Sequence, residues 1–194
     1  MERTLLPWSA GTWTTPPAHV EEADGDLLVT CVEGSDAWRV TSYGFTHDTE
    51  HALVAPLPQD TAMEVVFTVD YDQQFDQAGV YVVAAPDRWT KAGVEFADGH
   101  PQLGAVVTGP YSDWSVAPVD AWRGQRVRVR VSRSGDALTV RAGIDGEPLA
   151  LVRVAPFPED AEASAGPLTC APTRAGLTVR FHEWSTTAAD ASLH

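Results

Sequence analysis

The sequence predicts an all-β fold, a two-sheet antiparallel sandwich of the jelly-roll type. Apolar and polar residues alternate along short segments, Gly, Pro or Asp turns separate these segments, and none has a helical period. We expect ten strands, a number that suits a jelly roll. They are placed at residues 26–33, 37–43, 62–71, 77–84, 90–97, 102–108, 126–132, 137–143, 149–154 and 176–184.

Turn sequences between these segments support the strand assignment. Ala-Asp-Gly at 23–25 and 97–99, Ser-Gly-Asp at 134–136 and Asp-Gly at 145–146 are typical of tight β connections, and we expect hairpins at 97–99 and 134–136. The proline-rich stretch 155–173 is expected to be a long crossover without a strand. Residues 1–186 are predicted to form one domain, followed by a mobile C-terminal tail at 187–194.

The charge of the chain restricts its partners. With 13 Lys+Arg against 27 Asp+Glu, the formal net charge is −14, which repels nucleic acid and anionic membrane surfaces. The sequence has neither a signal-peptide pattern at its start nor an apolar run of about 18 residues, so we expect a cytoplasmic protein. Cys31 and Cys170 lie in apolar segments, where free thiols pack as small hydrophobes, and their spacing excludes a cysteine-based zinc site.

One predicted strand carries arginine on alternate positions. Arg126, Arg128 and Arg130 point away from the intervening valines, either as an anion-binding patch or as a solvated sheet back on which they pair with acidic residues of neighbouring strands. The second interpretation is favoured.

The strands at 77–84 and 90–97 present a different surface. Period two directs Ala78, Val80 and Val82 into the core and leaves small and polar residues on the opposite face. That face carries Gln77, Gly79 and Tyr81 on one strand and Lys91, Gly93 and Glu95 on the next. Glycine beside glycine predicts a shallow depression bordered by polar groups, as a concave binding surface requires.

Tryptophan beside polar groups suggests sugar binding, because an indole offers an apolar face to the C–H groups of a sugar ring. Most of the seven tryptophans are expected to be structural. Trp114 is the exception, because it lies with Asp113 in a loop directly after a strand, where binding sites are common.

The sequence also contains candidate residues for catalysis and for metal binding. A glycosidase requires two carboxyl groups about 5–10 Å apart, and Glu95 could find a partner only in Asp76 or Asp113. Lys91 lies about 13 Å from Glu95 along an extended strand and cannot pair with it directly. His47 and His51 suggest a metal site of low specificity, since this segment is expected to be a loop, and no metal or cofactor is expected.

Residues 75–115 resemble the DUF1349 family, also called regulation-of-enolase-like proteins. The elements that carry the resemblance are Asp-Gln-Ala-Gly, Lys-Ala-Gly-Val-Glu, Asp-Gly, Val-Val-Thr and Ser-Asp-Trp-Ser, with Ser-Asp-Ala-Trp and Tyr-Gly upstream at 35–44. The resemblance implies a concanavalin A-like lectin/glucanase sandwich, without the Glu-x-Asp-x-x-Glu pattern of the glucanases. It marks as family-like positions Trp38, Tyr43, Gln77, Lys91, Glu95, Asp113 and Trp114.

Three functional hypotheses follow. The leading one is a binding protein that holds a carbohydrate or related small polar metabolite on the concave sheet, with a regulatory role in sugar metabolism. Gln77, Lys91 and Glu95 are expected to hydrogen-bond to the ligand and Trp114 to stack on it. The full set of expected ligand-binding residues is Trp38, Tyr43, Gln77, Tyr81, Lys91, Glu95, Asp113 and Trp114. The second is a sugar-active enzyme with Glu95 as acid or base and Lys91 tuning its charge. The third is a protein-interaction module, and the oligomeric state is left open.

Overall fold

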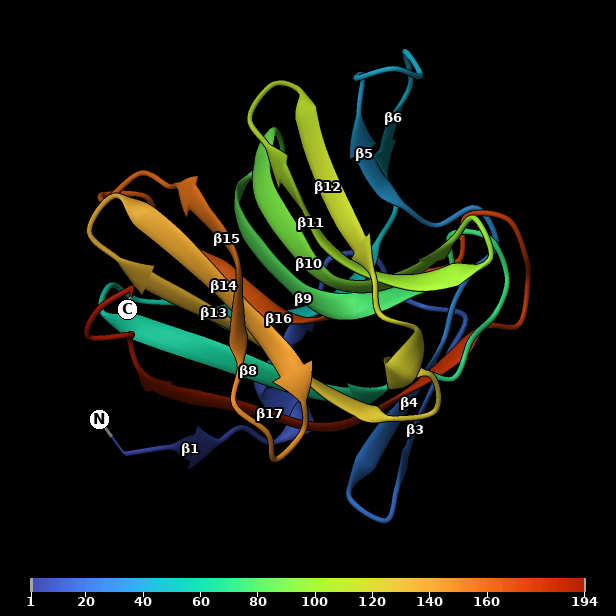
Figure 1. The fold of residues 1–194 in the computed structure, drawn as a ribbon, viewed down its shortest axis with the longest axis horizontal. Coiled ribbons are helices and arrows are strands. Elements are labelled where there is room, and N and C mark those ends of the chain that lie inside the picture. Colours follow the sequence, from blue (N-terminus) through green and yellow to red (C-terminus); the bar gives the residue numbers. More distant parts are fainter. Residues whose placement is uncertain (1, 194) are drawn as a thin grey trace.

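The computed structural model describes residues 2–193, and its architecture is a sandwich of two antiparallel sheets (Figure 1). One sheet has eight strands in the order β15-β14-β13-β8-β17-β4-β3, with β1 paired to β17. Its strands are β1 (Thr4–Leu5), β3 (His19–Ala23), β4 (Asp26–Thr30), β8 (Thr61–Thr68), β13 (Arg126–Ser134), β14 (Ala137–Ile144), β15 (Ala150–Pro156) and β17 (Thr178–Ala188).

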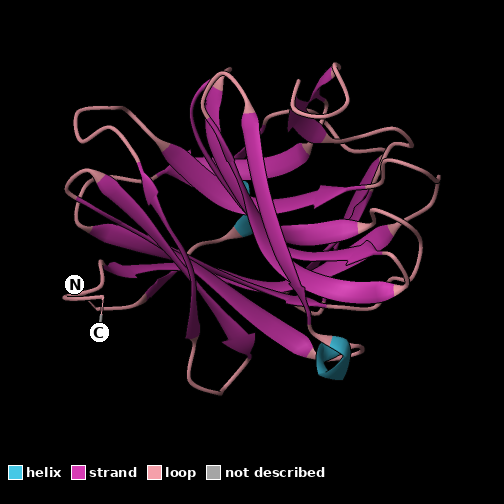
Figure 2. Ribbon diagram, turned by 45° about the horizontal axis from the view of Figure 1, so that its top comes forward, coloured by secondary structure: helices cyan, strands magenta, loops and turns pink. Residues whose placement is uncertain are grey.

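The second sheet has seven strands in the order β12-β11-β10-β9-β16-β7-β2, and β9 to β11 curve strongly in Figure 1. Its strands are β2 (Thr12–Trp13), β7 (His51–Pro56), β9 (Gln77–Ala85), β10 (Arg88–Ala97), β11 (His100–Thr108), β12 (Ser112–Pro118) and β16 (Ser164–Cys170). A separate hairpin of β5 (Ala37–Arg39) and β6 (Thr46–Asp48) stands beside this sheet. The remaining regular elements are two short 3₁₀ turns, η1 (Trp8–Ala10) and η2 (Asp120–Trp122), seen as the small helical segments of Figure 2.

The core lies between the sheets and follows the expected alternation. Ala78, Val80 and Val82 of β9 are buried there, and Trp184 of β17 is among its largest fully buried side chains. Burying aliphatic and aromatic groups at about 25 cal/mol per Å² is the main stabilisation of such a sandwich. In the part of the chain that the structure describes, no helix is long and apolar enough to cross a membrane.

The expected hairpins at 97–99 and 134–136 are confirmed. They join β10 to β11 and β13 to β14, and Asp98 and Gly99 both have positive φ, as a tight hairpin turn requires. The arginine face is also confirmed as a paired sheet back. Arg128 donates to Glu64, Asp145 and Glu183 at 2.6–3.0 Å, so its charge is already neutralised by the protein.

Two expectations about the chain's organisation are wrong. Residues 155–173 are not a crossover, because β16 lies within them and pairs with both β9 and β7. The expected tail also starts too early, because β17 continues to Ala188. Asp190 then accepts hydrogen bonds from Arg130 at 2.8 Å and Arg141 at 3.0 Å.

Candidate functional site

The floor of the candidate site is the outer face of β9, β10 and β11, on the side of the seven-stranded sheet away from the core. Gly79, Gly93 and Gly104 are in register across these three strands. A Cβ atom on Gly93 would lie 2.6 Å from the Cα atom of Gly79 and 2.1 Å from the carbonyl oxygen of Ala78. The absence of side chains therefore lets the strands approach closely and leaves a bare centre with polar residues on both sides.

A buried ion pair lies on one side of this glycine row. The Lys91 ammonium donates to Asp36 Oδ1 and to Gln77 Oε1, both at 2.8 Å, and only 6 % of the Lys91 side chain is exposed. Burial lowers the pKa of Lys91, but the charges around it, above all Asp36, outweigh burial and raise that pKa overall. Lys91 is therefore a fixed cation whose charge Asp36 balances.

Glu95 lies two residues beyond Gly93 on the same face, in register with Gln77 on one side and Gln102 on the other. No hydrogen bond is made to its carboxylate by residues 2–193. Burial raises the pKa of Glu95 to about 7; Lys91 opposes this shift, and the negative charges of Asp36 and Asp98 add to it. Glu95 thus has an unpartnered carboxyl group close to its titration point at neutral pH.

The β5–β6 hairpin forms the wall opposite the sheet. Trp38 of β5 is 8 % exposed and meets Trp114 of β12 edge to face, with ring centroids 6.3 Å apart and an interplanar angle of 89°. The Tyr43 ring lies edge to face with Trp38 and stacks on Phe45, with ring centroids 5.6 Å and 5.3 Å apart respectively. The Arg39 backbone N–H donates to Ser112 Oγ at 2.9 Å and ties the hairpin to the edge of the sheet.

The hairpin and the sheet enclose a cavity of about 310 Å³, which we call the aromatic pocket. Its lining combines five aromatic rings with a few polar groups, the usual composition of a small-molecule site. The lining residues are Gly34, Asp36, Trp38, Tyr43, Phe45, His47, Phe75, Gln77, Lys91, Glu95, Val106, Trp114, Pro172 and Thr173.

Six of the eight residues expected to bind ligand come together in this pocket, namely Trp38, Tyr43, Gln77, Lys91, Glu95 and Trp114. Tyr81 does not join them, because it is buried against Trp89 at 5.6 Å on the same sheet face. Asp113 is also outside the pocket, and its exposed carboxylate pairs with Arg153 at 3.0 Å. Trp114 lies in strand β12 rather than in the expected loop.

Sequence reasoning missed several residues of the pocket, and Asp36, Phe45 and Phe75 are the charged and aromatic ones among them. Asp36 lies within the segment 35–44 that carries the family resemblance, Phe45 directly follows that segment, and Phe75 begins the segment Phe-Asp-Gln-Ala-Gly. The resemblance was the only signal for Asp36, because its partner Lys91 is 55 positions away along the chain.

The alternative acids and the histidines have structural partners. Asp76, a candidate second acid, has a fully buried side chain bound by Arg174 at 2.6 Å. Nδ1 of His51 lies 3.1 Å from the Thr15 carbonyl oxygen, and Nε2 accepts from the Val32 N–H at 3.1 Å. Among the described residues no group of three or more His, Cys, Asp or Glu is arranged to hold a metal ion.

Replacing Glu95 with Gln is expected to stabilise the protein at high pH. In the folded state its pKa is about 7 against an ordinary 4.5, so the folded state retains a proton that the unfolded state has released. Stability therefore falls as the pH rises from about 4.5 to about 7, and Gln removes this loss. We expect the variant to exceed the wild type by about 1–3 kcal/mol at pH 8 and nearly to match it at pH 4.5. Urea unfolding at both pH values measures the difference, and a difference independent of pH would contradict the burial of this carboxyl.

An antiparallel β-sandwich with a polar-floored, aromatic-walled pocket on the outer face of one curved sheet is the fold class that the sequence predicted. Solved structures agree with this assignment. A functionally unknown protein from Saccharomyces cerevisiae superposes with a TM-score of 0.89 at 36 % identity, covering 96 % of this chain and 100 % of the other. A xylan β-1,4-xylosidase from Bacillus halodurans C-125 has a TM-score of 0.73 at 14 % identity; 96 % of this chain matches 39 % of that enzyme, and this likeness concerns the fold alone.

The chain belongs to the family described as "Protein of unknown function (DUF1349)", whose model matches residues 13–189. It is 38 % identical over 180 residues to the Saccharomyces cerevisiae protein named Regulation of enolase protein 1, an alignment that covers 93 % of this chain and 90 % of that protein. The family resemblance found in the sequence is confirmed.

Proposed function

We propose that this protein binds a carbohydrate or a related small polar metabolite in the aromatic pocket, as a non-catalytic domain with a regulatory role in sugar metabolism. The observation that carries the proposal is that one pocket is lined both by aromatic rings and by an amide, an ammonium and a carboxylate group. Sugar C–H faces pack on indole rings such as Trp114, and hydroxyl groups hydrogen-bond to amide, ammonium and carboxylate groups such as Gln77, Lys91 and Glu95.

The relative's name supports the regulatory part of the proposal, since 38 % identity over most of both chains joins this protein to a regulation-of-enolase protein. We place the activity in the cytoplasm because Cys31 and Cys170 are buried free thiols, which a reducing compartment preserves. Since the pocket opens beside a surface hairpin, we expect affinities in the millimolar to micromolar range.

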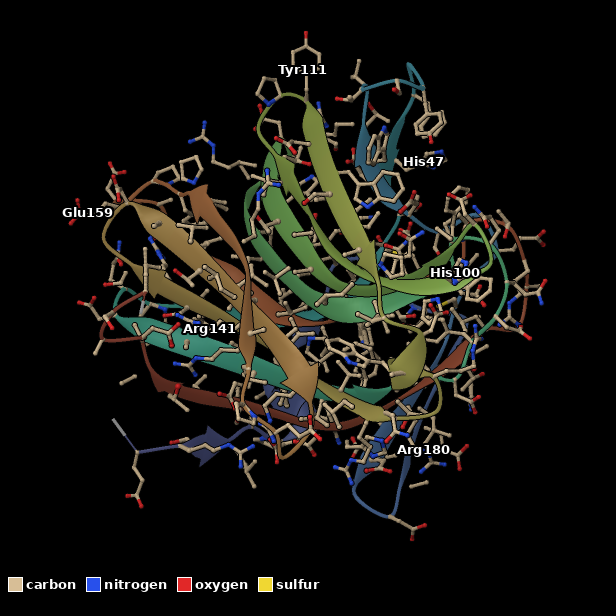
Figure 3. The ribbon with its side chains drawn as sticks, in the orientation of Figure 1. His47, His100, Tyr111, Arg141, Glu159 and Arg180 are labelled. Atoms are coloured by element: carbon tan, nitrogen blue, oxygen red, sulfur yellow. The ribbon has the colours of Figure 1, made fainter. Side chains whose placement is uncertain are left out.

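A screen of monosaccharides, oligosaccharides and sugar phosphates by calorimetry tests the proposal. Replacing Trp114 with Ala should weaken any hit by tenfold or more, because the stacking of the sugar ring on the indole is lost. Tyr111→Ala is the matched control, because Tyr111 is 62 % exposed at the tip of the β11–β12 turn, away from the pocket lining (Figure 3). If Trp114→Ala binds every hit as the wild type does, the site is wrong; if nothing binds, the function is wrong.

An enzyme acting on sugars is the second candidate, and the raised pKa of Glu95 favours it because a general acid must hold its proton near neutral pH. Two of the acids that could assist Glu95 are engaged elsewhere, since Asp36 pairs with Lys91 and Asp76 with Arg174. Incubating each hit with the protein and analysing it by mass spectrometry separates the two candidates. A product that the Glu95→Gln variant does not form would establish the enzyme.

A further inference from the structure

The charges of the aromatic pocket do not cancel. Lys91 and Asp36 form an ion pair at 2.8 Å, and together they contribute no net charge. Glu95 is the third charged group in the lining, and its ionised form has no opposite charge or hydrogen-bond donor of its own among residues 2–193. When Glu95 is ionised, the pocket therefore carries one unbalanced negative charge.

The groups around Glu95 do not supply the missing partner. Lys91 on its own strand is engaged by Asp36, and Asp98 in the following turn adds negative charge. The neighbouring strands present uncharged amides, Gln77 from β9 and Gln102 from β11, and the loop after β16 presents Pro172 and Thr173. His47 of β6 lies in the lining in edge-to-face contact with Phe45 and is labelled on the hairpin in Figure 3.

The walls suit a cation as well. Trp38 and Trp114 stand at 89° to each other, so their rings form a corner, and Tyr43 and Phe45 continue the aromatic wall along the hairpin. Ring faces attract an ammonium group, most strongly those of tryptophan, by about 0.5–2 kcal/mol each according to exposure. Aromatic rings that surround a site with one uncompensated carboxylate are the environment in which organic ammonium ions bind.

We propose that the aromatic pocket selects ligands that carry an ammonium group, seated between the Glu95 carboxylate and the aromatic rings. The inference rests on the proposed function, and within that function it identifies the ligand class as amino sugars or similar small amines rather than neutral sugars. A cation supplies the charge partner that Glu95 lacks, whereas a neutral sugar leaves the half-buried carboxylate without an opposite charge. The net charge of −14 also attracts cations over a longer range.

Choline and 3,3-dimethyl-1-butanol test the inference, because they have nearly the same shape, choline is charged at every pH and the alcohol is neutral. Binding is followed by calorimetry and by the intrinsic tryptophan fluorescence, to which Trp38 and Trp114 in the pocket lining contribute. We expect choline to bind at least tenfold more tightly than the alcohol at pH 8. Since the pKa of Glu95 is about 7, its ionised fraction rises about tenfold from pH 6 to pH 8, and choline affinity should rise with it. Glucosamine and glucose, compared at pH 7, extend the test to sugars.

Glu95→Gln should abolish both the preference for choline and the dependence on pH. Asp87→Asn is the matched control, because it removes the same charge from an exposed turn outside the pocket lining and should keep both effects. Equal binding of the charged and neutral members of both pairs would overturn the inference while leaving the proposed function intact. Failure of all four compounds and of every compound in the sugar screen would overturn both.

Discussion

Replacing Lys91 with Met is expected to lower the free energy of unfolding by about 3–5 kcal/mol, the typical loss when one partner of a buried ion pair is removed. The Lys91 side chain is 6 % exposed and that of Asp36 19 %. Without the ammonium, the Asp36 carboxylate retains, among residues 2–193, only neutral donors, the Ala37 N–H at 2.8 Å and the Gln77 amide at 3.4 Å. The expected loss comes from this uncompensated charge, since Met preserves most of the packing of the lysine stem.

The double variant Lys91→Met with Asp36→Asn separates charge from packing. We expect the second substitution to recover most of the lost stability in urea unfolding at pH 7, because it neutralises the stranded carboxylate. Arg153→Met is the control for an exposed pair; its partner Asp113 has a side chain that is 68 % exposed, and the expected loss is under about 1 kcal/mol. A double variant as unstable as Lys91→Met alone would show that the pair's charges are not what stabilises the site.

Period-two alternation predicted most of the sandwich because burial on one face alone dictates the pattern. It placed Ala78, Val80 and Val82 in the core, and it placed Gln77, Lys91 and Glu95 together on the outer face. The same alternation places Gly79 and Gly93 on the outer face and thereby predicts the depression there. What depends only on a strand's own residues could therefore be read from the chain.

Strands whose sequence contradicts strand preference were missed. β16 contains Gly166 and Pro167, which read as loop residues, although Pro167 still aligns with Val80 in the ladder to β9. In the ladder to β7, Ala165 and Leu168 are paired, whereas Gly166 and Pro167 between them are not. This gap is expected because proline has no N–H to donate. Tertiary packing against two neighbouring strands outweighed the local preference here.

The site could be predicted only on its sheet side. Alternation states which face a residue is on but not what covers that face, so Tyr81 was expected to be open and is instead covered. The wall formed by Trp38 and Phe45 depends on where the β5–β6 hairpin folds back, and the Lys91–Asp36 pair joins segments that are distant in sequence. Such non-local contacts leave no periodic signal in one chain.

Gly93→Ala is expected to destabilise the protein by about 3 kcal/mol or more, at the upper end of overpacking losses. Its Cβ would stand 2.1 Å from the carbonyl oxygen of Ala78 and 2.6 Å from the Cα atom of Gly79. Both obstacles are backbone atoms of β9 in the middle of the sheet, so neither can rotate away, and β9 and β10 must separate. Urea unfolding measures the loss. A shift of the intrinsic tryptophan fluorescence, to which Trp114 in the pocket lining contributes, reports a change in the shape of the pocket.

Two further glycines make this prediction specific. Gly104→Ala should cost less than Gly93→Ala, because its Cβ would meet Ser115 and Val116 of β12, an edge strand with no further strand of the sheet beyond it. Gly109→Ala should change stability by no more than about 0.5 kcal/mol, since no atom lies within 4 Å of its added Cβ. If Gly93→Ala unfolds at the same urea concentration as Gly109→Ala, close strand approach is not what the glycine row provides. If Gly93→Ala does not fold, Gly104→Ala is compared with Gly109→Ala instead. Forced separation of neighbouring strands predicts that Gly104→Ala unfolds at a lower urea concentration than Gly109→Ala.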